Sequence, residues 1–191
     1  MFTQGSWLNP PENWSADGAQ LRVTTDANTD FWRKTSYGFI RDSGHFFGTE
    51  IDGDFTAQLH VAAQYSALYD QAGMMVRIDE QHWIKCGVEF SDGQLLLSTV
   101  LTVDKSDWAV SLAPAMPDGF WLRVTVEKGV LRVQYSTDGK LWPLLRLAPF
   151  PEAGHYRVGP MCCTPERGGL EVAFSHFTVG PVQRKDLHDL T

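Results

Sequence analysis

The sequence predicts an all-β protein, built as a sandwich or a barrel, and three observations lead to this fold class. Turn-forming glycines recur along the chain, the residues between them alternate between apolar and polar, and no segment shows a sustained helical period. Turn signals about every ten residues between alternating segments are typical of β-sandwiches and barrels. We therefore interpret the segments between the turns as antiparallel strands.

The turn signals are dipeptides that end in glycine. Glycine lacks a Cβ atom and adopts positive φ angles without strain, so Asp-Gly between two alternating segments is a strong signal for a hairpin. We expect such turns at Asp52-Gly53, Asp92-Gly93, Asp118-Gly119, Lys128-Gly129 and Asp138-Gly139.

Three segments, 73–80, 83–90 and 121–127, show the two-residue period of a half-buried strand most clearly. Every second side chain in them is apolar, and we expect these side chains to lie between the sheets. The expected core residues are Met74, Val76, Ile78, Ile84, Cys86, Val88, Phe90, Leu122, Val124 and Val126. Further strands are expected at 54–61, 95–103, 130–136, 156–162 and 170–179. The Ala-rich stretch 61–72 is the best alternative candidate for a short helix.

Length and composition indicate a single globular domain. The chain has 191 residues, of which 43% are apolar and 20% are charged. A fold of this size buries roughly 70% of the surface of its unfolded chain, so it needs no disulfides. We assign residues 1–180 to one domain. Residues 181–191, which are polar and follow a Gly-Pro break, are expected to form a loosely held tail.

Charge and cysteine usage limit the partners and the compartment. The net charge of −7 argues against a nucleic-acid partner, and the apolar runs are far shorter than the roughly 20 residues of a membrane span. The N-terminal residues lack the features of a secretory signal, and the three cysteines, Cys86, Cys162 and Cys163, are an odd number. We therefore expect free thiols, a cytoplasmic protein and, since no nucleotide or metal motif occurs, no cofactor and no metal.

The candidate binding site follows from the same alternation. If the apolar set faces the core, then Arg77, Asp79, Trp83, Lys85 and Glu89 share the other face of two adjacent strands. An indole beside charged groups is the kind of platform on which sugars stack and form hydrogen bonds. The alternative interpretation is a solvated face with ion pairs such as Arg77–Glu89 and Asp79–Lys85.

Residues outside these strands extend the candidate site. Tyr69, Asp70 and Gln71 precede the first strand, and a loop there would overhang the face. His45, from an earlier segment, is expected at the rim, although a lone histidine is more often structural than functional.

Catalysis on this face would need a pair of carboxyl groups. Asp79 and Glu89 are the one same-face pair on the two strands, and Asp70 is a further candidate from the loop. Each strand carboxylate has an expected cationic partner, which would keep it ionised, whereas a general acid needs a raised pKa. The pattern therefore argues against hydrolysis.

Long blocks of the sequence also resemble a known family. They read WLNPP at 7–11, TDFWR at 29–33, YGFIRD at 37–42, YDQAG at 69–73, RID at 77–79, WIK at 83–85, SDW at 106–108 and GPMCC at 159–163. Together they resemble the domain-of-unknown-function 1349 family over roughly residues 5–180. The resemblance implies a two-sheet antiparallel jelly-roll sandwich of the concanavalin A-like lectin/glucanase type, with one concave face. It implies no established reaction, but the family includes proteins named as enolase regulators.

Three functional hypotheses follow. The first is a non-catalytic carbohydrate-binding or sugar-metabolism accessory protein that holds a carbohydrate or small polar ligand on the concave face. The second is a glycoside-acting hydrolase or lyase that uses Asp79 and Glu89 or Asp70. The third is a protein–protein interaction module that regulates a metabolic enzyme.

Overall fold

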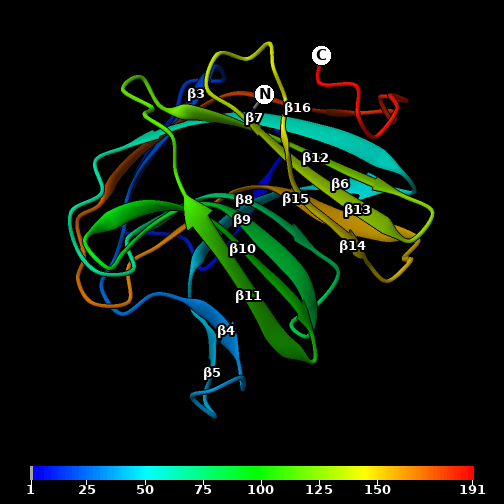
Figure 1. The fold of residues 1–191 in the computed structure, drawn as a ribbon. Helices are drawn as coiled ribbons and strands as arrows, with labels where there is room; N and C mark the ends of the chain where they lie inside the picture. The colour runs from blue at the N-terminus through cyan, green and yellow to red at the C-terminus, as the bar shows by residue number, and fades with distance from the viewer. Residues whose placement is uncertain (1) are drawn as a thin grey trace.

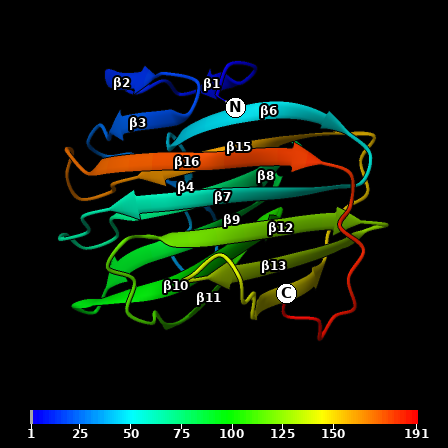
Figure 2. The same ribbon diagram turned by 90° about the horizontal axis from the view of Figure 1, so that it is seen from above.

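The computed structural model describes residues 2–191, and its regular elements are all strands. Two antiparallel seven-stranded sheets stack face to face (Figure 1), which confirms the β-sandwich. The first sheet has the order β1-β6-β15-β8-β9-β10-β11 and the second has the order β14-β13-β12-β7-β16-β3-β2. Seen from above, the second sheet covers the first (Figure 2). No helix of the described residues is long and apolar enough to cross a membrane.

The strands of the first sheet are β1 (Ser6–Leu8), β6 (His45–Asp52), β8 (Gln71–Arg77), β9 (His82–Ser91), β10 (Gln94–Val103), β11 (Lys105–Leu112) and β15 (His155–Cys163). Those of the second sheet are β2 (Asn13–Ala16), β3 (Gln20–Thr24), β7 (Phe55–Ala63), β12 (Phe120–Glu127), β13 (Val130–Ser136), β14 (Leu144–Pro149) and β16 (Glu171–Gly180). A separate hairpin consists of β4 (Phe31–Arg33) and β5 (Ile40–Asp42). The alternative helix candidate, 61–72, contains no helix: residues 61–63 end β7, residues 64–70 are irregular, and residues 71 and 72 begin β8.

The five predicted glycine turns all have positive φ, as expected, but two of them do not close hairpins. Gly93, Gly129 and Gly139 lie between strands that pair with each other. Gly53 and Gly119 instead lie where the chain passes from the first sheet to the second. Glycine turns therefore occur both within hairpins and between the two sheets. The local sequence does not indicate whether the next strand joins the same sheet or the other one.

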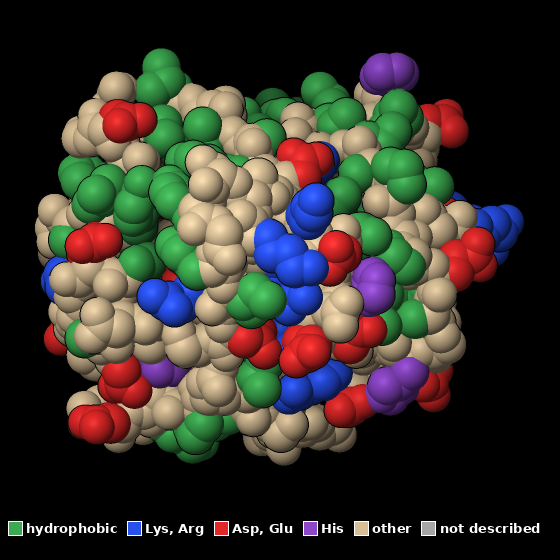
Figure 3. Space-filling view, turned by 90° about the horizontal axis from the view of Figure 1, so that it is seen from below, with side chains coloured by type: hydrophobic (Ala, Val, Ile, Leu, Met, Phe, Trp, Pro, Cys, Tyr) green, Lys and Arg blue, Asp and Glu red, His purple; other side chains and the backbone are tan. Residues whose placement is uncertain are grey.

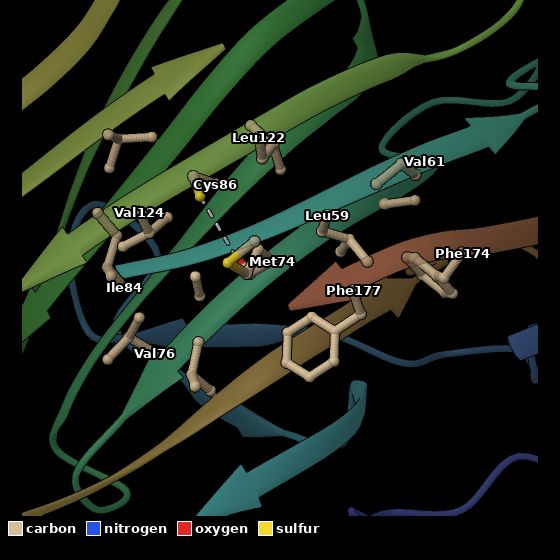
Figure 4. Packing of buried hydrophobic residues seen from close by; sticks show 14 of the residues in the cluster. Leu59, Val61, Met74, Val76, Ile84, Cys86, Leu122, Val124, Phe174 and Phe177 are labelled. Carbon is tan, nitrogen blue, oxygen red and sulfur yellow. Dashed lines mark hydrogen bonds between the residues drawn. The ribbon is translucent and has the colours of Figure 1, made fainter. Parts of the chain in front are cut away.

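The predicted strand register is correct. Met74, Val76, Ile84, Val88 and the three expected residues of β12 are buried in one cluster between the sheets (Figure 4). Cys86 lies in the same cluster, and its thiol donates to the backbone carbonyl of Met74 at 3.5 Å. Ile78 and Phe90 are only partly buried, because the first follows the end of β8 and the second lies near the end of β9.

A second apolar cluster lies on the outer face of the first sheet. The β4–β5 hairpin projects below this sheet (Figure 1), and its Phe31 and Trp32 pack onto Met75, Trp83 and other side chains of the sheet. The ring centroids of Phe31 and Trp83 are 6.1 Å apart. Trp83 is therefore fully buried, and the prediction that its indole is open to a ligand is wrong.

The C-terminal segment has no strand or helix, but hydrogen bonds connect it to the second sheet. Gln183 donates its backbone N–H to Thr56 Oγ1 at 3.0 Å, and the carbonyl of Leu190 accepts from the backbone N–H of Trp142 at 2.8 Å. Arg123 also donates to the carbonyl of Thr191. Residues 181–191 thus contact the domain at several points.

Candidate functional site

A pocket of about 200 Å³ lies between the outer face of the first sheet and the β4–β5 hairpin. Its polar lining consists of Asp30, Gln71, Lys85, Glu89 and Glu166. Its aromatic lining consists of Trp32, Tyr37, Phe39, Tyr69 and Trp108. Figure 3 shows the molecule from the side of the hairpin, where acidic and basic side chains gather in mixed groups.

Two glycines lie on the sheet between the polar side chains. Gly73 and Gly87 face each other across β8 and β9, on the same face as Lys85 and Glu89. A Cβ atom on Gly73 would lie 1.9 Å from the carbonyl oxygen of Cys86, and one on Gly87 would lie 2.2 Å from that of Ala72. The two strands thus approach closely here, and Gly87 has no side chain of its own to place between Lys85 and Glu89.

Lys85 forms a buried ion pair at one end of this gap. Its Nζ lies 3.0 Å from Asp30 Oδ1, which also accepts the backbone N–H of Phe31 at 2.8 Å. Burial by itself lowers the pKa of Lys85, but Asp30, with smaller contributions from Cys163 and Glu89, outweighs it, so the pKa lies above its ordinary value. Lys85 therefore stays charged.

Glu89 lies at the other end and is also buried. Its Oε2 accepts from Ser98 Oγ at 2.8 Å, and Ser98 Oγ accepts from Trp108 Nε1 at 3.2 Å. Burial raises the pKa of Glu89, and the Lys85 ammonium and the Ser98 hydroxyl offset this only in part. Glu89 thus takes up a proton at a higher pH than an exposed glutamate, because no cation of the described residues forms an ion pair with it.

Gln71, the first residue of β8, and Tyr69, in the turn before this strand, both line the pocket. Gln71 lies opposite Glu89 in the sheet and is more than nine-tenths buried, and its side-chain amide has no hydrogen-bond partner in the described part of the chain. Tyr69 has a positive φ of 62°, and a hydrogen bond with Tyr37, with burial, raises the pKa of Tyr69 to about 12. Both side chains are therefore positioned to contact a ligand.

Asp70 holds this turn in place. Its Oδ2 accepts the backbone N–H groups of Ser66 and Ala67 at 2.9 and 3.0 Å, and its carboxylate forms a two-point ion pair with Arg167. Burial raises its pKa, but Arg167 and the backbone donors outweigh it and leave the pKa below its ordinary value. Asp70 is thus a positioning residue and not a proton donor.

The aromatic side chains form one wall of the pocket. The planes of Trp32 and Trp108 are nearly perpendicular, at 87°, with centroids 6.3 Å apart, and Tyr37 packs on Trp32 at 5.7 Å. Tyr37 and Phe39 stack at 5.3 Å and are exposed. Aromatic rings at a pocket mouth provide apolar faces on which a ring-shaped or cationic ligand stacks.

The structure brings together only part of the predicted site. Lys85, Glu89, Tyr69 and Gln71 line the pocket, but Arg77 and Trp83 do not. The register pairs Arg77 with Trp83 and Gln71 with Glu89, so the two pairs are separated by roughly 20 Å at about 3.3 Å per residue. The predicted Arg77–Glu89 ion pair is therefore wrong, and Arg77 instead pairs with Asp42 at 2.8 Å.

The predicted carboxyl pairs do not form either. Asp79 lies in the exposed turn after β8, where it accepts from the backbone of Gln81 and bonds to His82. It contacts neither Glu89 nor its expected partner Lys85, whose partner is Asp30. With Asp70 held by Arg167, the structure does not support the proposed acid pairs of a hydrolase.

His45 is structural in this fold. It is buried, with Nδ1 2.8 Å from the carbonyl of Asn9 and Nε2 accepting the backbone N–H of Asp26 at 3.0 Å. It does not line the pocket. Among residues 2–191 no group of three or more His, Cys, Asp or Glu side chains is arranged to hold a metal ion.

Sequence reasoning missed Asp30, Trp32, Trp108 and Glu166 as site residues. The first three lie in blocks that carry the family resemblance, TDFWR and SDW, and this is the signal that could have found them. Asp30 lies 55 positions before Lys85, so strand alternation gives no indication of that contact.

The fold and the pocket define a β-sandwich protein with a small covered site on one sheet. The chain belongs to the DUF1349 family of proteins of unknown function, whose model matches residues 7–182. It is 57% identical over 190 residues to "Regulation of enolase protein 1" of Saccharomyces cerevisiae, covering all of this chain and 96% of the relative.

Solved structures show the same architecture. A functionally unknown protein from Saccharomyces cerevisiae superposes with a TM-score of 0.94 at 56% identity, over 96% of this chain and 99% of that one. A carbohydrate-binding module, CBM66 from Bacillus subtilis, matches with a TM-score of 0.57 at 12% identity, over 93% and 96%. A GH43 protein from Bacillus licheniformis matches with a TM-score of 0.71 at 16% identity, over 94% of this chain but 37% of its own. At these low identities the last two show the fold alone.

Proposed function

We propose that this protein binds a carbohydrate or a similarly small polar ligand in the pocket between the first sheet and the β4–β5 hairpin, and that it does so without catalysis. The observation that carries the proposal is Gln71, a residue more than nine-tenths buried that lines the pocket and whose side-chain amide has no hydrogen-bond partner among residues 2–191. The N–H and C=O groups of this amide are therefore available to form hydrogen bonds with a ligand that enters the pocket.

The size and chemistry of the pocket support a ligand of about one sugar ring. Its volume of about 200 Å³ is below the roughly 300–1,000 Å³ of pockets for drug-sized ligands. Trp108 offers an aromatic face, while Lys85 and Glu89 offer a donor and a carboxyl group. This combination suits the apolar face and the hydroxyls of a sugar, and the fold is one that carbohydrate-binding modules also use.

The binding test compares two exposed tryptophans. Trp108→Ala removes one ring of the aromatic wall and should lower the affinity for a bound sugar at least about fivefold, because stacking contributes on the order of 1 kcal/mol beyond buried area. Trp14, which is 45% exposed on β2 and does not line this pocket, provides the matched control Trp14→Ala. Screening of a glycan array, followed by calorimetric titration, gives the measurement. An equal loss of sugar affinity in Trp108→Ala and Trp14→Ala would contradict the proposal.

A second candidate function is regulation of a metabolic enzyme through a protein contact. It is favoured by the name of the yeast relative. Edge strand β11 supports it, because Val110 and Leu112 expose apolar side chains on the pocket side of the sheet. Co-purification of the chain with enolase, compared with the same experiment on a Leu112→Lys variant, tests it. For the compartment we propose the cytoplasm, because all three cysteines are buried free thiols.

A further inference from the structure

The charges in the pocket do not balance. The lining contains three carboxyl groups, Asp30, Glu89 and Glu166, and a single cation, Lys85. Lys85 Nζ bonds to Asp30 at 3.0 Å, so these two charges compensate each other. Glu89 is left without an ion-pair partner among residues 2–191, and exposed Glu166 adds a further negative charge at the rim.

A buried carboxylate without an ion-pair partner is unfavourable, since burial removes its hydration. The hydroxyl of Ser98, a neutral donor at 2.8 Å, and the nearby ammonium of Lys85, which is paired with Asp30, compensate only part of this loss. A positive group on the ligand would provide the missing partner, because charge-assisted hydrogen bonds are about twice as strong as neutral ones. An anionic ligand would face two uncompensated carboxyl groups.

The aromatic wall favours the same kind of ligand. Trp108 is connected to Glu89 through Ser98, so an indole lies next to the uncompensated carboxyl group. Trp32 stands nearly perpendicular to Trp108, and Tyr37 packs on Trp32. The faces of Trp and Tyr rings attract cations within about 6 Å. Rings of differing orientation around one small pocket offer a cation more than one such face.

We propose that the ligand of this pocket carries a positively charged ammonium group, held between the Glu89 carboxylate and the aromatic wall. The inference rests on the proposed function, binding of a small polar ligand at this site, and it names the ligand class. The shared chemistry is a small organic ammonium, and its source is either an amino sugar of one ring or a quaternary amine of similar size.

The experiment titrates the intact protein at pH 7 with D-glucosamine, D-glucose, D-glucuronate and choline by calorimetry. D-Glucosamine and D-glucose differ in one substituent, so their ratio reports the contribution of the amine. We expect D-glucosamine to bind at least about tenfold more tightly than D-glucose, which corresponds to one charge-assisted hydrogen bond. D-Glucuronate is expected to bind most weakly. Choline separates a quaternary amine from an amino sugar as the source of the charge.

The variant Glu89→Gln keeps the shape of the side chain and removes its charge. It should abolish the preference for D-glucosamine, so that the variant binds D-glucosamine and D-glucose with affinities that differ by less than about threefold. The matched control Glu171→Gln, at an exposed position outside this pocket, should keep the preference. If Glu89→Gln does not fold, the ranking of the four probes on the native protein decides the question.

The outcomes separate the two proposals. Equal affinity for D-glucosamine and D-glucose, or tightest binding of D-glucuronate, overturns the amine inference and leaves sugar binding standing. Binding of choline with no binding of any sugar supports the amine inference and contradicts carbohydrate binding. No binding of any of the four probes overturns both.

Discussion

At the scale of single residues, Trp83 shows how burial changes a role. The sequence places it on the outer face of β9, and that is where it lies, but Phe31 covers it and it is fully buried. Its Nε1 donates to the carbonyl of Glu80 at 3.2 Å, so its polar atom also has a partner within the protein. Trp83 thus stabilises the attachment of the β4–β5 hairpin and does not contact the proposed ligand.

The first prediction follows for Trp83→Ala. Truncation of a large buried aromatic side chain leaves a cavity and should lower the free energy of unfolding by about 3–5 kcal/mol. Trp108→Ala, at a side chain that is 39% exposed, should cost much less stability while it weakens binding. Urea unfolding followed by circular dichroism measures both. A loss of sugar affinity without a loss of stability in Trp83→Ala would show that Trp83 is not part of a core.

The second prediction concerns the pH dependence of Glu89. Because burial raises its pKa in the folded protein, the folded state binds this proton more tightly than the unfolded state does. The associated stability is present below the unfolded pKa of about 4.3 and is lost as the pH rises through the higher folded pKa. Without ligand, Glu89→Gln should therefore raise the free energy of unfolding at pH 7 relative to the native protein.

Near pH 4 the difference in the free energy of unfolding between Glu89→Gln and the native protein should be smaller, since Glu89 is then protonated and resembles glutamine. Unfolding curves at several pH values provide the measurement, with Glu171→Gln as the control that shows no such trend. A stability difference that does not vary between pH 4 and pH 7 would mean that Glu89 is not desolvated in the folded protein.

At the scale of elements, the sequence predicts individual strands well and their spatial assembly only in part. The alternation in β8 and β9 gives the correct core face, because a one-residue slip would have turned every side chain over. Residues on the same face of a sheet can nevertheless lie far apart along the strands. The turn between β8 and β9 pairs Arg77 with Trp83, and counting outward from that turn would have put Gln71, not Arg77, opposite Glu89.

The β4–β5 hairpin could not be predicted from local patterns. Its strands have three residues each, too few for a two-residue period to stand out. Its position is fixed by long-range contacts, Phe31 with Trp83 and Asp30 with Lys85, which no local spacing encodes. Since this hairpin covers the sheet and forms one side of the pocket, the part of the site that the sequence missed is the part that depends on tertiary packing.

At the scale of the whole molecule, the protein has two cores of unequal size. The large cluster between the sheets contains Cys86 and Cys162, and the small cluster under the β4–β5 hairpin contains Cys163. All three cysteines are buried free thiols, and burial raises the pKa of each of them, that of Cys86 to about 12. Thiolates are the reactive species, so the folded protein should react slowly with thiol reagents at neutral pH.

The unequal cores predict an order of reaction for these thiols. Local opening needs less free energy where fewer apolar contacts must be broken, and detachment of the β4–β5 hairpin disrupts only the small cluster. Cys163 should therefore be labelled by a thiol reagent before Cys86 and Cys162, whose exposure needs separation of the two sheets. Labelling in low concentrations of urea, followed by peptide mass spectrometry, gives the three rates, and Trp83→Ala should accelerate the labelling of Cys163 most. Identical rates at all three cysteines would instead show that hairpin and sandwich unfold as a single cooperative unit, and that the pocket cannot open without global unfolding.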